Sequence, residues 1–501
     1  MTLPARNPLA PDGLEPPADP NALAPHVWSR TATRDEEGQL VLGGLSAGAL
    51  RERFGTPLTV LDEADARGRM AEARAAFEEA FSAIGSSCAL YYAGKAFLAT
   101  TVVRWVFEEG LRLDVASGGE LAVALAGGMP GERIGFHGNN KSVAEIERAI
   151  EAGVGTIILD SEEERGRVAR AAAERGVRQR VRIRVNSGIH ATTHSFLATA
   201  HEDQKFGIPL ERAEAYAAAV RAEPSLELVG LHSHIGSQIF DTSGFRAAAE
   251  RLLEVHARIG EQGGQLPELN LGGGFGIAYV ERERPVDLAE MARRLAEDVA
   301  AACERLGIPV PALAFEPGRA LIGPAGTTLY EVGTVKPVEV AVDDAPEGAP
   351  RSAVRRYVSV DGGMSDNARP ALYDAEYTVR LASRASDAEP ALVRVAGKHC
   401  ESGDLVVLAD YLPEDVRPGD LLAVPATGAY CWSLSSNYNL LPRPAIVAVR
   451  DGEARLVIRR ETIEDLLARD AGIDEADEAA SAAAAPVSAP DPDRTREDST
   501  R

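Results

Sequence analysis

Short hydrophobic runs alternate with Ala-, Glu- and Arg-rich segments along the middle of this chain of 501 residues. The runs are rich in β-branched and aromatic side chains, which is typical of buried strands, and the segments between them have a helical composition. Eight such runs stand at residues 89–95, 111–115, 134–137, 156–160, 181–186, 228–234, 269–272 and 313–316. They predict an α/β fold with a (β/α)8 barrel of the TIM type, and a doubly wound open sheet is the alternative.

Nearly every predicted strand ends in a polar residue or a glycine, and this feature favours the barrel. Active sites of TIM-type barrels gather at the rim formed by the carboxyl ends of the strands. We therefore expect the functional side chains among these strand ends: Lys95, Asp114, His137, Asp160, Asn186, His234, Gly272–Gly274 and Glu316.

After about residue 322 the pattern changes to alternating strands separated by Gly, Pro and Asp turns, which predicts a second, all-β domain of the barrel or sandwich kind. Two earlier runs, at 40–42 and 58–61, could join it. Both chain ends hold few large apolar side chains and cannot offset the entropy of ordering. We expect unstructured ends at 1–25 and 471–501, joining strands at 26–60, the barrel at 61–322 and the β domain at 323–470.

The composition narrows the possible partners and compartments. A formal net charge of -23 argues against nucleic acid and anionic membranes, because the field of the protein repels both. Four cysteines without a Cys-x-x-Cys pair indicate a reducing compartment, and neither a signal peptide nor a membrane-length apolar run is recognisable. These observations favour the cytoplasm.

Lys95 ends the first predicted strand of the barrel. A lysine at a strand end is usually a solvated charge, but this strand is otherwise uncharged. A desolvated ammonium has a lowered pKa and can attack a carbonyl. Pyridoxal 5'-phosphate pairs such a lysine with carbanion chemistry, and it also needs a phosphate cradle, a partner for the ring nitrogen and a surface for the ring face.

The ends of strands seven and eight offer two of these features. Gly273 and Gly274 could present backbone N–H groups to a phosphate, although a glycine cluster is more often a turn. Glu316 could keep the pyridine nitrogen protonated, and the turn Pro317-Gly318-Arg319 follows it where TIM barrels often complete a phosphate site.

The sequence His232-Ser233-His234 allows two interpretations. Alternate residues of a strand face the same side, so the two histidines could bind a metal, but no accompanying set of metal-spaced ligands is present. An imidazole of His234 stacked on the cofactor ring, with Ser237 near the phosphate, fits the other residues better.

Three segments of the β domain carry further candidates. Arg369 and Tyr373 lie close together in a Pro-containing loop and could grip a carboxylate, although most such pairs are surface residues. Cys400 and Glu401 place a thiol beside a carboxylate in a turn that could equally be a loop with a buried cysteine. Tyr430 belongs to an aromatic turn that is more often used for packing.

Taken together and in this order, these segments resemble the bacterial meso-diaminopimelate decarboxylases, which are fold-type III pyridoxal-phosphate enzymes. The resemblance covers about residues 35–470. The motifs that carry it are Tyr92–Lys95, 194–207, His232–Gln238, Glu316–Arg319, Asp361–Met364, Arg369–Tyr373 and Cys400–Asp404.

The resemblance implies a role for each candidate residue. Lys95 would form the Schiff base with the cofactor, His234 would stack on the ring and Glu316 would pair with its nitrogen. Cys400 would donate the proton and Glu401 would hold the distal amine of the substrate. The residues implied around the cofactor, chiefly its phosphate, are Gly273, Gly274, Glu316–Arg319, Ser237 and Tyr430; those implied for the substrate are Arg319, Arg369, Tyr373 and Tyr430.

The implied reaction is decarboxylation of meso-2,6-diaminopimelate to L-lysine and carbon dioxide, the last step of lysine biosynthesis, by a homodimer that shares its active sites. A carboxylate clamp favours this substrate over ornithine or arginine, whose cationic tails are best served by acids. The alternatives are a decarboxylase of the same fold acting on another amino acid, a racemase, and a non-catalytic relative that binds a partner.

Overall fold

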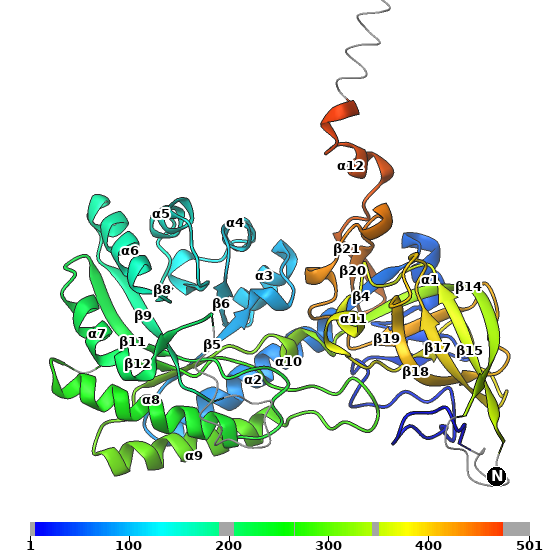
Figure 1. Ribbon diagram of the computed structural model, residues 1–501, viewed down its shortest axis with the longest axis horizontal. Helices are drawn as coiled ribbons and strands as arrows, with labels where there is room; N and C mark the ends of the chain where they lie inside the picture. Colours follow the sequence, from blue (N-terminus) through cyan, green and yellow to red (C-terminus); the bar gives the residue numbers. More distant parts are fainter. Residues whose placement is uncertain (1–5, 190–204, 265, 343–349, 474–501) are drawn as a thin grey trace, which may run out of the picture.

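The structure, a computed structural model, describes residues 6–189, 205–264, 266–342 and 350–473. Within this part of the chain a parallel (β/α) barrel and a mixed β domain lie side by side and are joined near helix α10 (Arg319–Ile322) (Figure 1). Residues 194–204 of one motif and 474–501 of the expected tail lie outside the described residues. No helix within the described residues combines the length and apolar character needed to cross a bilayer.

All eight predicted barrel strands are present and parallel. The sheet closes because β8 pairs with β9 and β13 pairs with β5, and this closure confirms the barrel over the open sheet. The strands are β5 (Cys88–Ala93), β6 (Arg112–Val115), β7 (Ile134–Phe136), β8 (Thr156–Leu159), β9 (Gln179–Asn186), β11 (Leu226–His232), β12 (Glu268–Asn270) and β13 (Ala312–Phe315). A two-residue strand, β10 (Ile208–Pro209), extends β9 on one side.

Helices surround the barrel, and several begin at residues whose side chains cap the free N–H groups of the first helical turn. Ser142 and Glu145 form a capping box at the start of α5, and the hydroxyl of Ser161 accepts the N–H of Glu164 in α6. Phe77 of α2 packs within 6 Å of Phe275 and Phe315, so this helix is fixed to the barrel. The helices are α2 (Glu63–Ala83), α3 (Thr100–Glu108), α4 (Gly118–Ala126), α5 (Val143–Glu151), α6 (Glu162–Glu174), α7 (Ala213–Arg221), α8 (Ser243–Glu261) and α9 (Leu288–Leu306).

The β domain is built from both ends of the chain. Strand β4 (Leu58–Asp62) precedes the barrel but pairs antiparallel with β14 and parallel with β20, which both follow it. The remaining strands are β14 (Gly326–Ala341), β15 (Ser352–Val360), β16 (Arg380–Leu381), β17 (Pro390–Ala396), β18 (Leu405–Pro413), β19 (Leu421–Pro425), β20 (Ala445–Arg450) and β21 (Glu453–Ile458); two short helices, α11 (Arg369–Tyr373) and α12 (Ile463–Leu467), accompany them.

The N-terminal segment differs from the expectation of an unstructured end. Residues 6–25 contain no helix or strand, yet Leu9, Ala10 and Leu14 pack on Leu392 and Tyr411 of the β domain. The run at 40–42 packs on the β domain, and the N–H of Leu40 donates to the carbonyl oxygen of Ala382 there. It forms β2 (Leu40–Leu42) of a small separate sheet with β1 (Thr33–Arg34) and β3 (Leu45–Ser46), which helix α1 (Ala47–Phe54) follows.

Candidate active site

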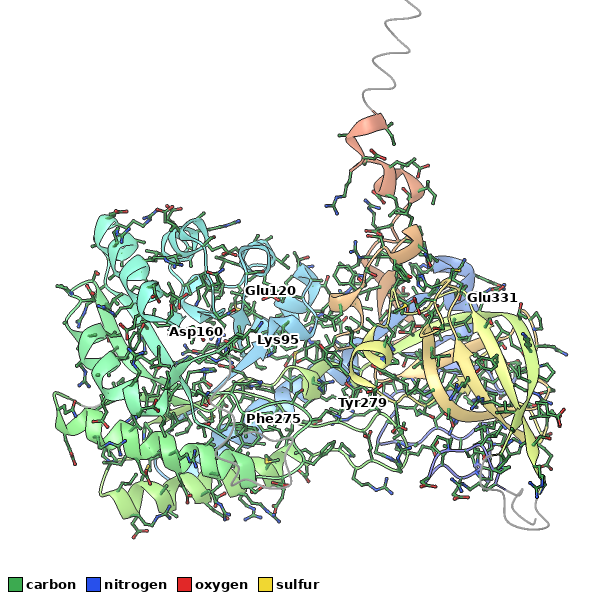
Figure 2. The ribbon with its side chains drawn as sticks, viewed as in Figure 1. Lys95, Glu120, Asp160, Phe275, Tyr279 and Glu331 are labelled. Atoms are coloured by element: carbon green, nitrogen blue, oxygen red, sulfur yellow. The ribbon has the colours of Figure 1, made fainter. Side chains whose placement is uncertain are left out.

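A cavity of about 1050 Å³ opens between the carboxyl ends of the barrel strands and the β domain. Figure 2 shows Lys95 and Glu120 on the barrel and Tyr279 on the side toward the β domain. Most of the site residues predicted from the sequence line this cavity: Lys95, His234, Ser237, Gly274, Glu316, Gly318, Arg319, Arg369, Tyr373 and Tyr430.

Lys95 projects into the cavity from a single 3-10 turn directly after β5. Gly94 before it passes so close to β6 that a Cβ there would stand 2.7 Å from the carbonyl oxygen of Asp114. The Lys95 amine can be reached through the cavity, but protein atoms surround it. Burial lowers its pKa more than the nearby Glu316 and Asp114 raise it, so the amine loses its proton and becomes nucleophilic more readily than a solvated lysine does.

Glu316 stands at the end of β13, where three side chains converge on its carboxylate. Asn270 donates from Nδ2 at 2.7 Å, and the Nε2 atoms of His232 and His137 lie 3.1 and 3.4 Å from Oε1. Burial alone would raise the pKa of Glu316, but these histidines bring it well below its ordinary value. Burial lowers the pKa of each histidine to about 4, so they contact Glu316 as neutral rings.

Asp114 is a second buried carboxyl beside this cluster. Its Oδ1 lies 3.2 Å from Nε2 of His137. Burial and the neighbouring Glu316 raise the pKa of Asp114 well above its ordinary value. Both carboxyl groups contact His137, and the raised pKa of Asp114 together with the lowered pKa of Glu316 favours the negative charge on Glu316.

The turns after β11, β12 and β13 pack backbone against backbone. A Cβ on Gly273 would stand 2.0 Å from the carbonyl oxygen of Glu316, and one on Gly274 would stand 2.4 Å from that of Gly236. Only glycine fits such approaches. The N–H of Gly273 also donates to Nδ1 of His234 at 3.3 Å, which fixes this ring at the cavity wall.

Arg319 forms the part of the wall next to Ser237. Its Nη2 donates to the Ser237 hydroxyl at 2.9 Å and its Nη1 donates to the Tyr279 hydroxyl. The guanidinium carbon lies 4.5 Å from the centre of the Tyr430 ring. Tyr430 has a left-handed backbone, with φ at 64°, and is held by its N–H bond to the carbonyl of Ala96. The arginine is thus placed by groups of both domains.

Arg369 approaches the cavity from α11 of the β domain. It is 5 % exposed, donates to the hydroxyl of Tyr377 and lies with its guanidinium carbon 4.4 Å from the centre of the Tyr279 ring. Tyr373, one helical turn further on, is 65 % exposed and stands at the cavity mouth. Arg319 and Arg369 thus both contact Tyr279. Their two positive charges give the cavity a region suited to a carboxylate or a phosphate.

Four predicted residues lie outside the cavity surface. Gly273 and Pro317 belong to turns that shape it, whereas Cys400 and Glu401 are exposed on a separate loop between β17 and β18. The structure of one chain therefore does not bring the thiol and its neighbouring carboxylate to Lys95.

Known proteins share this arrangement of sequence and fold. Residues 67–323 match the family model described as pyridoxal-dependent decarboxylase, pyridoxal binding domain. The chain is 52% identical over 452 residues to the diaminopimelate decarboxylase of Mycobacterium tuberculosis, a match that covers 89% of this chain and 98% of the relative. The chain belongs to the diaminopimelate decarboxylase family. This confirms the resemblance seen in the sequence, and the matched domain identifies pyridoxal phosphate as the cofactor.

Two further members of the diaminopimelate decarboxylase family support the assignment. The Bacillus subtilis enzyme is 43% identical over 443 residues, covering 88% of this chain and 97% of the relative. A solved structure of the diaminopimelate decarboxylase from M. jannaschii in complex with L-lysine is 30% identical, with a TM-score of 0.77, and covers 88% of this chain and 98% of that one. The whole enzyme, and not the barrel alone, is shared.

The residues on the cavity wall fit the cofactor that this decarboxylase family uses. The lowered pKa of Lys95 suits an amine that attacks the cofactor aldehyde. Glu316 is a buried, ionised acceptor suited to a protonated ring nitrogen. The turn at Gly273 and Gly274 admits no Cβ, and Arg319 with Ser237 offers charged and hydroxyl donors beside it.

Several residues of the site were not singled out from the sequence. Asp114 and His137 were noted only as strand ends, and closure of the barrel brings them to Glu316. Glu120 and Arg184 also line the cavity; Arg184 stands two residues after Arg182 on β9 and therefore shares its face of the strand, but this spacing indicates no role. Tyr279 lies in a loop, where no periodic pattern in the sequence marks it as a site residue. His232, weighed as a metal ligand with His234, contacts Glu316 instead.

Proposed function

We propose that this protein converts meso-2,6-diaminopimelate to L-lysine and carbon dioxide, as the last step of lysine biosynthesis. The observation that carries the proposal is the cavity itself. Lys95 and Glu316 stand on one wall, and Arg319 and Arg369 face the same space from two domains. A substrate with an amino-acid centre at each end uses both features, whereas ornithine or lysine would leave the arginine of the β domain without a carboxylate.

Each wall residue has a proposed part in holding the cofactor. Lys95 would bind its aldehyde carbon, His234 would cover the ring face, and the Glu316 carboxylate would accept a hydrogen bond from the protonated ring nitrogen. The glycine turn at Gly273 and Gly274, the Pro317-Gly318 turn, Ser237, Arg319 and Tyr430 surround the phosphate. When bound, pyridoxal phosphate supplies an electron sink for the bond that loses carbon dioxide. The hydrogen bonds that Glu316 accepts from the Asn270 amide and from the His232 ring keep its carboxylate ionised for that task.

The proposed substrate clamp consists of Arg369, Arg319, Tyr373 and Tyr430. Arg369 is oriented by the Tyr377 hydroxyl, and the Tyr279 ring separates it from Arg319. Because the guanidinium of Arg369 is almost fully buried, its bond to a carboxylate suffers little competition from water. The clamp therefore selects the end of the substrate that is not decarboxylated.

We also propose a homodimer in which Cys400 and Glu401 complete the cavity of the other subunit. Both residues are exposed and lie away from the Lys95 cavity of their own chain. Large apolar side chains are exposed around the mouth of that cavity and beside the Cys400 loop, as expected of a contact surface: Leu372, Tyr373, Leu434, Tyr438 and Leu440. Cys400 would donate the proton and Glu401 would bind the distal ammonium of the substrate.

Mixing two impaired variants tests this shared site. Lys95→Ala should abolish activity at every site of its own homodimer, and Cys400→Ala should leave each of its sites with only a slow residual turnover. A mixed dimer keeps one intact site, so random reassortment should restore about a quarter of the parent activity, as two-fold symmetry requires. If the mixture gains no activity over the separate variants while size-exclusion chromatography shows exchange of subunits, the two residues do not meet across subunits.

The reaction itself is tested with a panel of substrates on purified protein. We expect rapid carbon dioxide release from meso-diaminopimelate and slow release from ornithine, arginine and lysine; preference for any of those three would refute the assignment. Chiral analysis of the products separates decarboxylation from racemisation. The four cysteines are free thiols, which supports our proposal that the enzyme works in the cytoplasm.

A further inference from the structure

The Cys400 loop is held in place by a short 3-10 turn, η5 (Tyr438–Leu440), from a distant part of the β domain. The backbone N–H of Cys400 donates to Oδ1 of Asn439 at 3.1 Å. The same oxygen lies 3.3 Å from Nδ1 of His399, the residue before the cysteine. One amide oxygen therefore joins η5 to two consecutive residues of the loop.

The hydrogen bonds of His399 determine which of its ring nitrogens carries the proton. The backbone N–H of Ser365 points at Nε2 from 3.3 Å, so Nε2 accepts. Nδ1 then carries the proton and donates it to Asn439. The ring also stacks on Tyr438, with ring centres 5.3 Å apart and an interplanar angle of 21°. Two hydrogen bonds and the stacking contact therefore fix the His399 ring. Its Nδ1–H in turn orients the Asn439 amide.

The base of the loop is rigid. The Asp404 carboxylate accepts the N–H groups of His399 and Met364 at 2.8 and 2.6 Å. A Cβ on Gly397 or on Gly363 would stand 2.2 or 2.6 Å from an oxygen of this carboxylate. With its base fixed in this way, the exposed tip at Cys400 depends on Asn439, whose side chain is the one that bonds the Cys400 backbone within the described residues.

The backbone of η5 adds a second and independent sign of function. Asn439 and Leu440 both have left-handed conformations, with φ at 51° and 55°. Asn tolerates this region, but Leu does not adopt it without strain. Strained backbone is kept where the surrounding structure or the function requires it. In this conformation the Asn439 side chain accepts the Cys400 N–H.

We propose that Asn439 is a positioning residue that aims the Cys400 thiol at one face of the substrate carbon. The inference rests on the proposed function. Loss of carbon dioxide breaks a C–C bond and leaves its electron pair on the substrate carbon. That pair takes the thiol proton to form the new C–H bond, and solvent then returns a proton to the thiolate. A thiol held in one place delivers the proton to one face, whereas a displaced thiol lets water deliver it to either face.

Two substitutions separate the backbone of Asn439 from its side chain. Asn439→Gly keeps the left-handed conformation and removes the acceptor oxygen. Asn439→Asp is compatible with the conformation and keeps an acceptor, so it serves as the matched control. We expect Asn439→Gly to lower kcat about 10- to 100-fold, as small misplacements of a reacting group do, with little change in KM. Asn439→Asp should retain most of kcat.

The decisive measurement is the stereochemistry of proton delivery. In D₂O the parent enzyme should place deuterium in a single configuration at the carbon of lysine that lost carbon dioxide, and NMR of the product reports this. Asn439→Gly should give a mixture of both configurations, and Asn439→Asp should give one. Alkylation provides a readout that needs no turnover. Cys400 is the exposed cysteine, and iodoacetamide should modify it several-fold faster in the Gly variant.

Controls distinguish failure of this inference from failure of the proposed function. If Cys400→Ala still yields one configuration, Cys400 is not the proton donor and the proposed role of the thiol fails. If Cys400→Ala gives a mixture but Asn439→Gly keeps kcat and a single configuration, only the positioning role is overturned. A Gly variant that is monomeric by size-exclusion chromatography would also overturn it, because Asn439 would then act on subunit pairing.

Discussion

Replacing Arg369 with methionine should reduce the selectivity of the enzyme for a substrate that carries a second carboxylate. Methionine has a stem of similar length and fills the space beside the Tyr279 ring without a charge. Arg369 already directs one N–H to the Tyr377 hydroxyl, so part of its planar fork is committed within the protein. The remaining donors face the cavity.

The size of the effect follows from this geometry. A hydrogen bond from a charged donor contributes about 1.5–3 kcal/mol. We count one such bond to the distal carboxylate, at the upper end of the range because Arg369 is only 5 % exposed. A loss of about 2–3 kcal/mol corresponds to a decrease in kcat/KM of about 30- to 150-fold for diaminopimelate.

The assay compares carbon dioxide release from diaminopimelate and from D-lysine, which keeps the reacting centre of the meso substrate but lacks the distal carboxylate. The kcat/KM for D-lysine should change less than about threefold in Arg369→Met, because no bond to the arginine is lost. Arg369→Lys keeps a charge but not the fork and should be intermediate. An equal decrease for both substrates, with an unchanged thermal melt, would refute the proposed clamp.

Three further outcomes are expected. Lys95→Ala should lose both activity and the visible absorbance band of the lysine-bound cofactor; an unchanged band would mean that another group binds the aldehyde. Asp410→Ala should lower the free energy of unfolding by about 1–3 kcal/mol in urea titrations, because it removes the buried acceptor shared by Thr378, Val379 and Arg380, while Arg380 keeps its ion pair with Glu281. Burial lowers the pKa of His256 to about 4, below the ordinary value of about 6.5, so only the unfolded chain takes up a proton between these pH values. The folded protein should therefore be most stable above about pH 6.5 and should lose stability as the pH falls toward 4. The free energy of unfolding of His256→Leu should fall less than that of the parent over this interval. Parallel plots of unfolding free energy against pH for the two proteins would contradict this.

The barrel could be predicted because most of its strands are short, buried and rich in apolar or β-branched residues, and because eight of them alternate with helical segments. Their polar ends also located the rim, so Lys95, His234 and Glu316 could be chosen before the fold was known. Shorter elements gave no comparable signal: β16 has two residues, and β21 carries exposed positions along its length. The N-terminal segment resembles a disordered one in composition, and its order comes from contacts with the β domain.

Some site residues could not be predicted from the sequence because they come together only through contacts between distant segments. Asp114 and His137 meet Glu316 only because the barrel closes, and no local pattern encodes that meeting. Tyr279 and Tyr377 orient the two arginines from loops without periodicity. Asn439 reaches Cys400 through a strained turn, which a single sequence does not reveal.

The pairing of β4 with β14 and β20 has a consequence for how the chain folds during synthesis. The ribosome makes β4 before the whole barrel, and β14 begins only at Gly326. At about 5–20 residues per second, β4 waits roughly 10–50 s for its first partner strand. The barrel can form on the ribosome in that interval, but the β sheet cannot close around β4 until the barrel has been made. Synthesis thus completes the lysine-bearing wall of the active site first and adds the wall that recognises the substrate last.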